Sequence, residues 1–214
     1  MKILNLYACL GGNRYKWNEV KNDIQVTAVE LDPECARLYQ ERFPNDKVII
    51  ADAHQYLLDH YKEYDFIWSS PPCPTHSRLQ HSNKTKAKMQ YPDMKLYQEI
   101  IFLDNFYNGK YCVENVIPFY EPLIPAKKRG RHLYWTNFNL PNVLSNKKNP
   151  DFTRVKNHTK VMSDYHKYDF NKYNGKQSKY KMSNNLVYFE DGKTIFETVC
   201  NIVRKENVKQ TELF

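Results

Sequence analysis

The first half of the chain alternates short apolar runs with segments whose apolar residues recur at helical spacing. Runs such as 2–7 (KILNLY) and 64–68 (YDFIW) are mostly apolar, as buried parallel strands are. Strands that alternate with helices predict a parallel sheet with crossover helices on its faces. We therefore expect an α/β fold with a doubly wound, mostly parallel sheet. The expected strands cover 2–7, 25–29, 47–50, 64–68 and 110–113, and the expected helices cover 13–20, 33–42, 53–61 and 92–107.

The regular alternation of strands and helices ends after residue 113. One more strand is expected at 131–138 (RHLYWTNF) and one more helix at 193–205, but 140–181 shows little periodicity. A structureless stretch of that length is uncommon inside a compact domain, so it forms either a small irregular subdomain or a long functional loop. The expected segments are a core over 1–138, a small irregular region over 139–181, a segment returning to the core over 182–205 and a tail over 206–214.

Charge and composition narrow the class of partner. The 214 residues carry a net charge of +8, which fits a polyanion such as nucleic acid, although a basic surface that only aids solubility would look the same. The five cysteines are scattered and form no CxxC pair, which argues against a disulfide framework and a zinc site and favours a reducing cytoplasm. No apolar run approaches the length of a signal peptide or a membrane span, so we expect no membrane partner.

A thiol and a carboxylate each follow a predicted strand. Cys73 lies among prolines in the segment 69–77 (SSPPCPTHS), and Glu114 follows the fifth expected strand. Because the carboxyl ends of parallel strands meet at one edge of a sheet, the two side chains can converge there. Such a pair suits covalent catalysis, with the thiolate as nucleophile and the carboxyl as proton donor, although Glu114 could instead form a structural salt bridge. Cationic neighbours would favour the thiolate, and the candidates are Arg129 and Arg131.

Acidic residues at the ends of two further strands outline a nucleotide pocket. Glu30 follows the second strand and Asp52 the third, where they could accept hydrogen bonds from ribose hydroxyls and from the exocyclic amine of adenine. Each carboxylate could instead be a helix cap, since Asp32 and Asp52 both precede helices. The turn at 7–12 (YACLGG) would let backbone amides approach a ligand, with an ordinary tight turn as the alternative. This turn contains neither GxGxxG nor GK[ST], so it does not specifically indicate a dinucleotide or a phosphate.

In this order the motifs resemble those of the cytosine-5 DNA methyltransferase family. The segment 6–12 (LYACLGG) is similar to the cofactor-binding first motif, 71–73 (PPC) to the catalytic motif and 114–116 (ENV) to a further catalytic motif. The resemblance runs from residue 3 to 138 and resumes near 182. The remaining motifs are matched by 29–33 (VELDP), Ala51, Asp52, Ser77, Leu96, 127–131 (KKRGR) and 182–187 (MSNNLV). The chain departs from the family pattern at Tyr7, Cys9, Pro74, Lys127 and Ser183, where the family has phenylalanine, glycine, glutamine, glutamine and glycine.

The resemblance implies a Rossmann-like fold that binds S-adenosyl-L-methionine and a covalent mechanism on a flipped-out base. The Cys73 thiolate would attack C6 of cytosine, Glu114 would hydrogen-bond N3 and the exocyclic amine, and Arg131 would contact O2. Asn115 would help to hold the loop that carries Cys73, and the activated C5 would take the methyl group. The residues implied to bind the cofactor are Tyr7, Ala8, Cys9, Leu10, Gly11, Gly12, Glu30, Leu31, Asp52, Ala53, Pro72, Leu96 and Asn184.

In this family the stretch between the strand at 131–138 and the last motif holds the target-recognition domain, and here that stretch is small. It is rich in lysine and aromatic residues, the composition of a surface for phosphates and bases, although a solvated basic linker is the alternative. A small recognition region predicts a short target sequence or loose specificity. The residues expected to contact nucleic acid are Ser77, Arg78, Lys84, Lys86, Arg129, Lys156, Lys160 and Lys179.

We therefore expect a cytoplasmic DNA (cytosine-5-)-methyltransferase that acts as a monomer on double-stranded DNA and needs no metal. It would belong to a restriction-modification system or a phage, or act alone. Three alternatives stay open: a tRNA cytosine-5 methyltransferase, a catalytically inactive DNA-binding paralogue, and an unrelated thiol enzyme in which His76 is the base for Cys73. The complete set of Cys73, Glu114 and Arg131 argues against the inactive paralogue.

Overall fold

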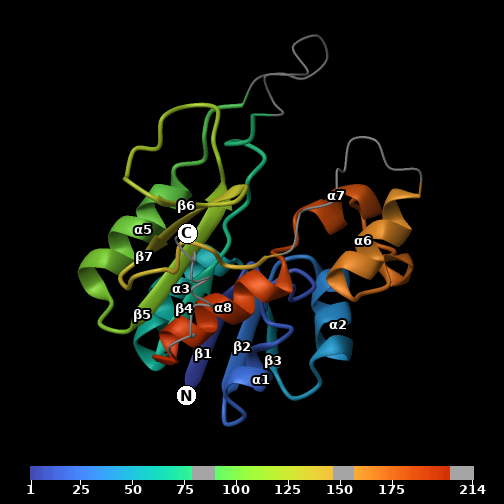
Figure 1. Cartoon of the computed structure of the whole chain (residues 1–214), viewed down its shortest axis with the longest axis horizontal. Helices are drawn as coiled ribbons and strands as arrows, with labels where there is room; N and C mark the ends of the chain where they lie inside the picture. The colour runs from blue at the N-terminus through green and yellow to red at the C-terminus, as the bar shows by residue number, and fades with distance from the viewer. Residues whose placement is uncertain (79–89, 147–156, 203–214) are drawn as a thin grey trace, which may run out of the picture.

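The computed structural model describes residues 1–78, 90–146 and 157–202 of the chain. Its sheet is built from β1 (Lys2–Leu6), β2 (Gln25–Glu30), β3 (Lys47–Ile50), β4 (Phe66–Ser69), β5 (Lys110–Val116), β6 (Lys127–Arg129) and β7 (His132–Thr136). The seven strands lie in the order β3-β2-β1-β4-β5-β7-β6 (Figure 1). β1 to β5 are parallel, and β7 runs antiparallel to both of its neighbours. The mostly parallel sheet predicted from the sequence is therefore confirmed.

Helices cover both faces of this sheet and include α1 (Trp17–Val20), α2 (Pro33–Arg42), α3 (Ala53–His60), α5 (Lys95–Phe106) and α8 (Phe189–Val199). Because side chains alternate along a strand, neighbours in β4 enter different cores. Phe66 packs with Phe196 under α1 and α8, whereas Ile67 packs with Leu103 under α3 and α5. α2 packs against β2 and β3. None of the described helices is long and apolar enough to cross a membrane.

Two helices begin where the sequence predicts, because each has a carboxylate cap. Asp32 accepts a hydrogen bond from the Glu34 amide at 2.9 Å, and Pro33 occupies the first turn of α2. Asp52 accepts from the Gln55 amide at 2.9 Å at the start of α3. Both bonds satisfy amides that a helix N-terminus leaves without an intrahelical partner. The caps therefore fix the chain direction just beyond the ends of β2 and β3.

Other boundaries differ from the sequence prediction. The helix expected over 193–205 is α8, which begins four residues earlier because Gly192 lies within it. A side chain at position 192 would collide with the backbone of Asn13, so glycine allows the helix to approach the turn after β1. α1 begins at Trp17 instead of residue 13. The short strand β6 is not predicted because its three residues are all charged.

The region 139–181, expected to be irregular, contains helices where the structure describes it. They are α6 (His158–His166), the 3-10 helix η2 (Phe170–Lys172) and α7 (Lys179–Asn184). We call residues 157–185 the helical lobe. Elements this short have too few turns for an apolar period to appear in the sequence. The expected tail at 206–214 lies outside the described residues.

Candidate active site

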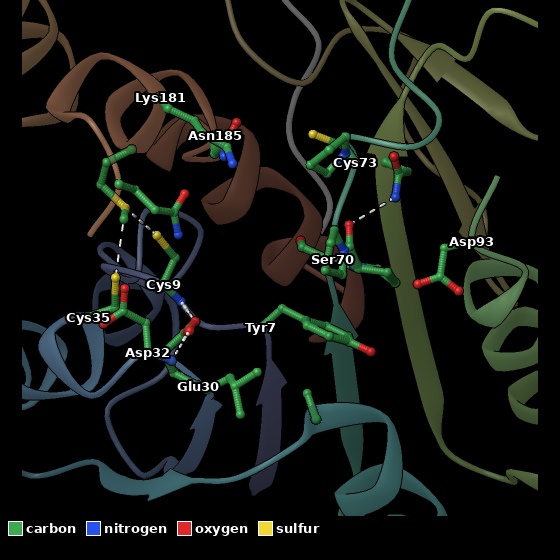
Figure 2. A pocket seen from close by; sticks show the side chains of 18 of the residues that line it. Tyr7, Cys9, Glu30, Asp32, Cys35, Ser70, Cys73, Asp93, Lys181 and Asn185 are labelled. Carbon is green, nitrogen blue, oxygen red and sulfur yellow. Dashed lines mark hydrogen bonds between the residues drawn. The ribbon is translucent and has the colours of Figure 1, made fainter. Parts of the chain in front are cut away.

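A cavity of about 880 Å³ lies between the carboxyl ends of the strands and the helical lobe (Figure 2). Its size is that of a site for a cofactor or another small ligand. One wall, the sheet side, includes Tyr7, Cys9, Glu30, Asp52, Cys73 and Glu114. The opposite wall, the lobe side, includes Gly175, Gln177, Lys181, Met182, Asn184 and Asn185.

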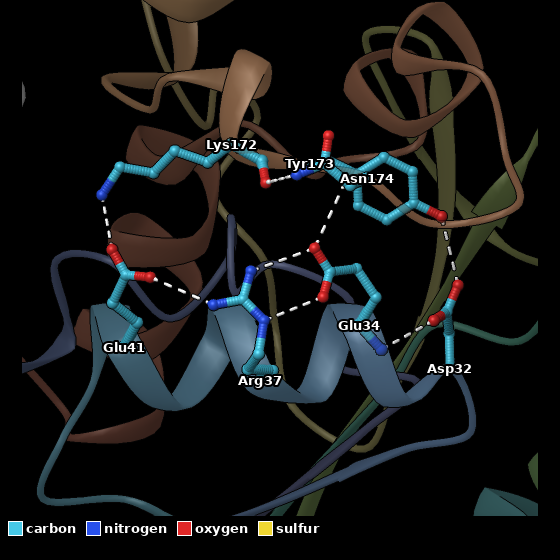
Figure 3. Close-up of polar contacts among 7 residues, drawn as sticks. All are labelled: Asp32, Glu34, Arg37, Glu41, Lys172, Tyr173 and Asn174. Atoms are coloured by element: carbon cyan, nitrogen blue, oxygen red, sulfur yellow. Dashed lines mark hydrogen bonds and ion pairs between the residues drawn. The ribbon is translucent and has the colours of Figure 1, made fainter.

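The lobe is held over the sheet by its contacts with α2. Phe170 and Met182 of the lobe pack with Cys35 and Leu38 of α2 in one buried cluster. Polar contacts surround that cluster, as Figure 3 shows. They are the bonds from Tyr173 to Asp32 at 3.2 Å, from the Asn174 amide to Glu34 at 3.3 Å and from Lys172 to Glu41 at 2.5 Å. The position of the lobe side therefore depends on side chains of one helix.

Cys73 lies in the loop after β4, and that loop is tied to β5. Asn115 Nδ2 donates to the carbonyl oxygen of Pro71 at 3.0 Å, and Asn115 Oδ1 accepts from the Val116 amide at 2.9 Å. The Cys73 carbonyl accepts from the amides of His76 and Ser77, each at 3.0 Å, which closes a turn around the thiol. Because β5 carries Glu114, the same strand positions the carboxylate and the loop of the thiol.

The electrostatic surroundings of Cys73 differ from the sequence expectation. Burial, followed by the negative charge of Glu114, raises the pKa of Cys73 to about 11. The charge that opposes this comes from Lys181 of the lobe. The expected partners lie elsewhere: Arg129 donates to the carbonyl groups of Lys128, Leu140 and Pro141, and Arg131 lines a second cavity. Cys73 is therefore a neutral thiol at neutral pH before a substrate enters.

Glu114 has a histidine neighbour that the sequence prediction missed. The carboxylate is 6% exposed, and its Oε1 lies 3.6 Å from Nε2 of His132 on the adjacent β7. In the register of the two strands Glu114 faces Tyr134, so His132, two positions away, shares its face of the sheet. Strand alternation alone could not have identified this residue, because its place beside Glu114 depends on the register of β5 and β7.

Arg131 does not line the main cavity, contrary to the expected catalytic set. It lines a second cavity of about 230 Å³ together with Tyr165 and Asp191. The two cavities share His132 and Asn184. The turn between β6 and β7, which comes directly before Arg131, contains Gly130 in the left-handed region, with a φ of +57°. The imidazole of His132 is consequently the basic group beside Glu114.

Both strand-end carboxylates line the cavity, and both also have structural partners. Glu30 accepts from the amides of Cys9 and Asp32, each at 2.8 Å, and burial raises its pKa. Asp52 caps α3 through one oxygen, while the other lies 3.8 Å from Lys95. The Gln55 amide and, to a smaller extent, this lysine lower the pKa of Asp52. Asp52 therefore both caps α3 and lines the cavity.

Only alternate residues of the turn at 7–12 reach the cavity. Tyr7 and Cys9 line it, with φ values of +54° and +46°. These values belong to the left-handed region, which favours glycine, so the cysteine that replaces the family's glycine at position 9 has a strained backbone. Four residues expected to bind the cofactor do not line the cavity, because they pack into the interior beneath it: Ala8, Leu10, Gly11 and Gly12.

A buried carboxylate fixes the ring of Tyr7. Glu99 of α5 is fully buried and accepts from the hydroxyl groups of Tyr7 at 2.5 Å and Ser69 at 2.6 Å. Nδ1 of His54 lies 3.0 Å from the same carboxylate, and this hydrogen bond raises the pKa of His54. Burial and Glu99 together raise the pKa of Tyr7. The network joins the ends of β1 and β4 to α3 and α5, and the sequence prediction missed it.

The residues expected to contact nucleic acid are dispersed. Arg78 Nε donates to the carbonyl oxygen of Pro118 at 3.1 Å, and Ser77 pairs with the same proline. Lys160 is exposed on α6, and Lys179 donates to the carbonyl oxygen of Asn171 at 3.3 Å. None of these four lines the main cavity, and their proposed contacts stay predictions. Three further candidates lie outside the described residues: Lys84, Lys86 and Lys156. Among the described residues, no three His, Cys, Asp or Glu side chains gather as a metal site.

Two of the comparisons with known proteins concern the sequence. A family model described as C-5 cytosine-specific DNA methylase matches residues 1–120, more than half of the chain. The match contains most of the sheet side of the cavity and ends before β6, β7 and the helical lobe. No curated protein matches the chain.

The third comparison, with solved structures, concerns the fold. The methyltransferase EhMeth of Entamoeba histolytica is similar over 96% of this chain and 99% of its own, with a TM-score of 0.53 and 10% identity. A DNMT2 mutant of Spodoptera frugiperda is 25% identical over 54% of this chain, with a TM-score of 0.38, and the chain spans 35% of its length. The plantazolicin methyltransferase BamL, solved with SAH, is 10% identical over 54% of this chain and 38% of its own, with a TM-score of 0.38. The extended likeness to EhMeth shows the Rossmann-like methyltransferase fold.

Proposed function

The chain belongs to the C-5 cytosine-specific DNA methylase family, and from that premise we propose that it methylates C5 of cytosine in double-stranded DNA. One observation carries the proposal: Cys73 and Glu114, from the ends of neighbouring strands, line the same cavity. An unrelated thiol enzyme would need His76 as a base for Cys73. Nδ1 of His76 is hydrogen-bonded to Tyr120 at 2.5 Å and its buried Nε2 has no hydrogen-bond partner among the described residues, so neither nitrogen is bonded to the Cys73 thiol.

The sheet side of the cavity offers hydrogen-bond acceptors and an apolar surface that suit S-adenosyl-L-methionine. Glu30 and Asp52 offer carboxylate oxygens at the ends of adjacent strands, where ribose and adenine could bind. Leu31 and Leu96 also line the cavity, and Leu31 is 66% exposed, so an apolar surface is available to a flat ring. When bound, the cofactor supplies an electrophilic methyl group. The ring of Tyr7, held by Glu99, borders the same space.

Activation of Cys73 would follow from binding of the base. Before that, burial and the charge of Glu114 keep the thiol protonated. N3 of neutral cytosine carries no proton, so Glu114 must first take one up, and the Cys73 thiol can supply it through solvent. The protonated carboxyl then donates to N3 and accepts from the amine, and its loss of charge removes one of the two causes of the raised pKa. Lys181 would favour the resulting thiolate from the lobe side.

The covalent steps then use the same pair of residues. Cys73 adds to C6, the electron pair of the ring double bond develops at C5, and Glu114 stabilises the charge that reaches N3. C5 accepts the methyl group, after which a water molecule takes the C5 proton, the double bond re-forms and the thiolate leaves C6. His132 lies 3.6 Å from Glu114 and is proposed to orient it. Arg131 would reach the base from the second cavity, which shares His132 with the first.

The target cytosine would have to leave the duplex to reach this site. Lys176 and Lys181 of the lobe line the cavity and are exposed, and Lys160 lies on the outer surface of α6. Positive groups around an opening suit the phosphates that flank an extruded base. We therefore assign the lobe to DNA contact, and double-stranded DNA is the proposed partner.

Bisulfite sequencing tests the proposed reaction. Plasmid DNA and tRNA are incubated separately with the purified chain and S-adenosyl-L-methionine. We expect protected cytosines in the plasmid, none in the tRNA, and none in either with Cys73→Ala. Protection confined to tRNA would move the assignment to the RNA branch of the family. Absence of protection in both substrates would contradict the proposal.

A further inference from the structure

Three sulfur atoms meet where the sheet side and the lobe side of the cavity join. Cys9 Sγ lies 3.0 Å from Met182 Sδ, and Cys35 Sγ lies 3.9 Å from the same atom. Figure 2 shows the side chains of Cys9, from the turn after β1, and Cys35, from α2, pointing toward each other, and Met182 belongs to α7. Because both thiols contact the same sulfur atom, they lie beside each other. The proposed methyl transfer uses neither of these cysteines.

The two thiols can be reached from the cavity although the cluster is mostly buried. Cys35 is 1% exposed and Cys9 is half-buried, but both line the 880 Å³ space. A small polar oxidant that enters the cofactor half of the cavity would meet Cys9 first. Cys35 contacts the same Met182 sulfur atom as Cys9, so a second thiol is already close to the first, as the formation of a disulfide requires.

We propose that Cys9 and Cys35 form an oxidation site for hydroperoxides, at which a disulfide closes the cofactor half of the cavity. The formation of the bond rests on the geometry of the two thiols alone. Its effect on the cofactor rests on the proposed function.

The chemistry balances with a hydroperoxide as the oxidant. The Cys9 sulfur attacks the outer peroxide oxygen and becomes a sulfenic acid, and the peroxide leaves as an alcohol or, from hydrogen peroxide, as water. Cys35 sulfur then displaces the sulfenic hydroxyl group, which leaves as a second water with the Cys35 proton. Two thiols are oxidised to one disulfide and one peroxide bond is reduced.

Closing the bond requires the sulfur atoms to approach to about 2 Å, so Cys9 must move toward α2. The backbone of Cys9 is strained, and its amide donates to Glu30 at 2.8 Å. A shift of Cys9 therefore displaces the acceptor proposed for the ribose. It also removes Cys9 Sγ from Met182, which packs α7 against α2.

Peptide mapping and ligand binding together test the proposal. The protein carries Cys73→Ser, so that the proposed nucleophile cannot react, and is treated with hydrogen peroxide. We expect a linked peptide that joins Cys9 to Cys35, lighter than the two free peptides by two hydrogen atoms. Affinity for S-adenosylhomocysteine, measured by calorimetry, should fall by about tenfold or more and return after reduction with dithiothreitol.

Two matched variants complete the test. Cys35→Ser should keep its affinity for S-adenosylhomocysteine under peroxide, whereas Cys200→Ser should lose it as the parent does. Absence of the linked peptide would overturn the proposal, as would oxidised protein that contains the link and binds the ligand normally. Reduced protein that binds no S-adenosylhomocysteine would count against the proposed function, while the linked peptide would still decide whether the disulfide forms.

Discussion

The two sides of the cavity are built in different ways. On the sheet side, Cys73 follows β4 and Glu114 lies near the end of the neighbouring parallel strand β5, and a buried bond from Asn115 to Pro71 ties the loop of Cys73 to β5. On the lobe side, Lys181 and Met182 come from a six-residue helix that docks on α2 through side chains. The family match covers most of the first side and none of the second. Backbone pairing between strands therefore positions the residues proposed for the chemistry. Side-chain contacts, which single substitutions can remove, position the lobe residues proposed to contact DNA.

The largest effect is expected from a change of charge on the sheet side of the cavity. Glu114→Gln should reduce kcat by about 10²–10⁴-fold, because the proton donor proposed for cytosine is lost. The same change should lower the pKa of Cys73 from about 11, because a negative charge beside the thiol is removed. Alkylation of Cys73 by iodoacetamide at neutral pH should therefore become faster while methylation becomes slower.

Lys181→Met provides the opposite change from the lobe side. It removes the positive charge that acts on Cys73, so the pKa should rise and alkylation should slow. Lys176→Met, in the same lobe but not among the groups acting on the thiol, is the matched control. Slower alkylation in Glu114→Gln would show that Glu114 does not hold the thiol in its protonated form.

A second prediction compares the hydrophobic core of the sheet with that of the helical lobe. Phe66 in the sheet and Phe170 in the lobe are both fully buried, so replacing either with alanine should cost about 3–5 kcal/mol locally. Phe66→Ala should lower the protection of all strands in hydrogen exchange. Phe170→Ala should open α6 and α7 and leave the amides of β1 and β4 protected, because the lobe can detach without unfolding the sheet. Equal loss of protection in both regions would refute this separation.

The smallest effect is expected from single hydrogen bonds. Tyr173→Phe removes the bond to Asp32 that fastens the lobe, and Tyr39→Phe removes the 2.9 Å bond to Asp46 beneath the sheet. Each change should cost about 1.5–3 kcal/mol, because the acceptor is a carboxylate. Denaturant unfolding should detect the loss in Tyr39→Phe as a lower global midpoint. In Tyr173→Phe, hydrogen exchange should detect it in the lobe alone, and a shifted global midpoint there would contradict the comparison.

The sequence predicts the sheet better than the lobe for physical reasons. Buried parallel strands appear as apolar runs, and residues that follow them, such as Cys73 and Glu114, must share one edge. In the sequence Gly192 suggests the boundary of a helix. The structure places it inside α8, where its lack of a side chain lets the helix pack against Asn13. The placement of His132 beside Glu114 depends on the register of two antiparallel strands, which a single sequence does not contain. The raised pKa of Cys73 likewise comes from burial, which only the folded chain defines.

Covalent trapping tests the central claim most directly. The purified chain is incubated with S-adenosyl-L-methionine and duplex DNA in which 5-fluorocytosine replaces cytosine, since fluorine at C5 prevents release of the enzyme. We predict a denaturation-resistant adduct attached through Cys73, absent in Cys73→Ser and much weaker in Glu114→Gln. An adduct that persists in Cys73→Ser, or protein that binds both DNA and cofactor yet forms no adduct, would contradict the account.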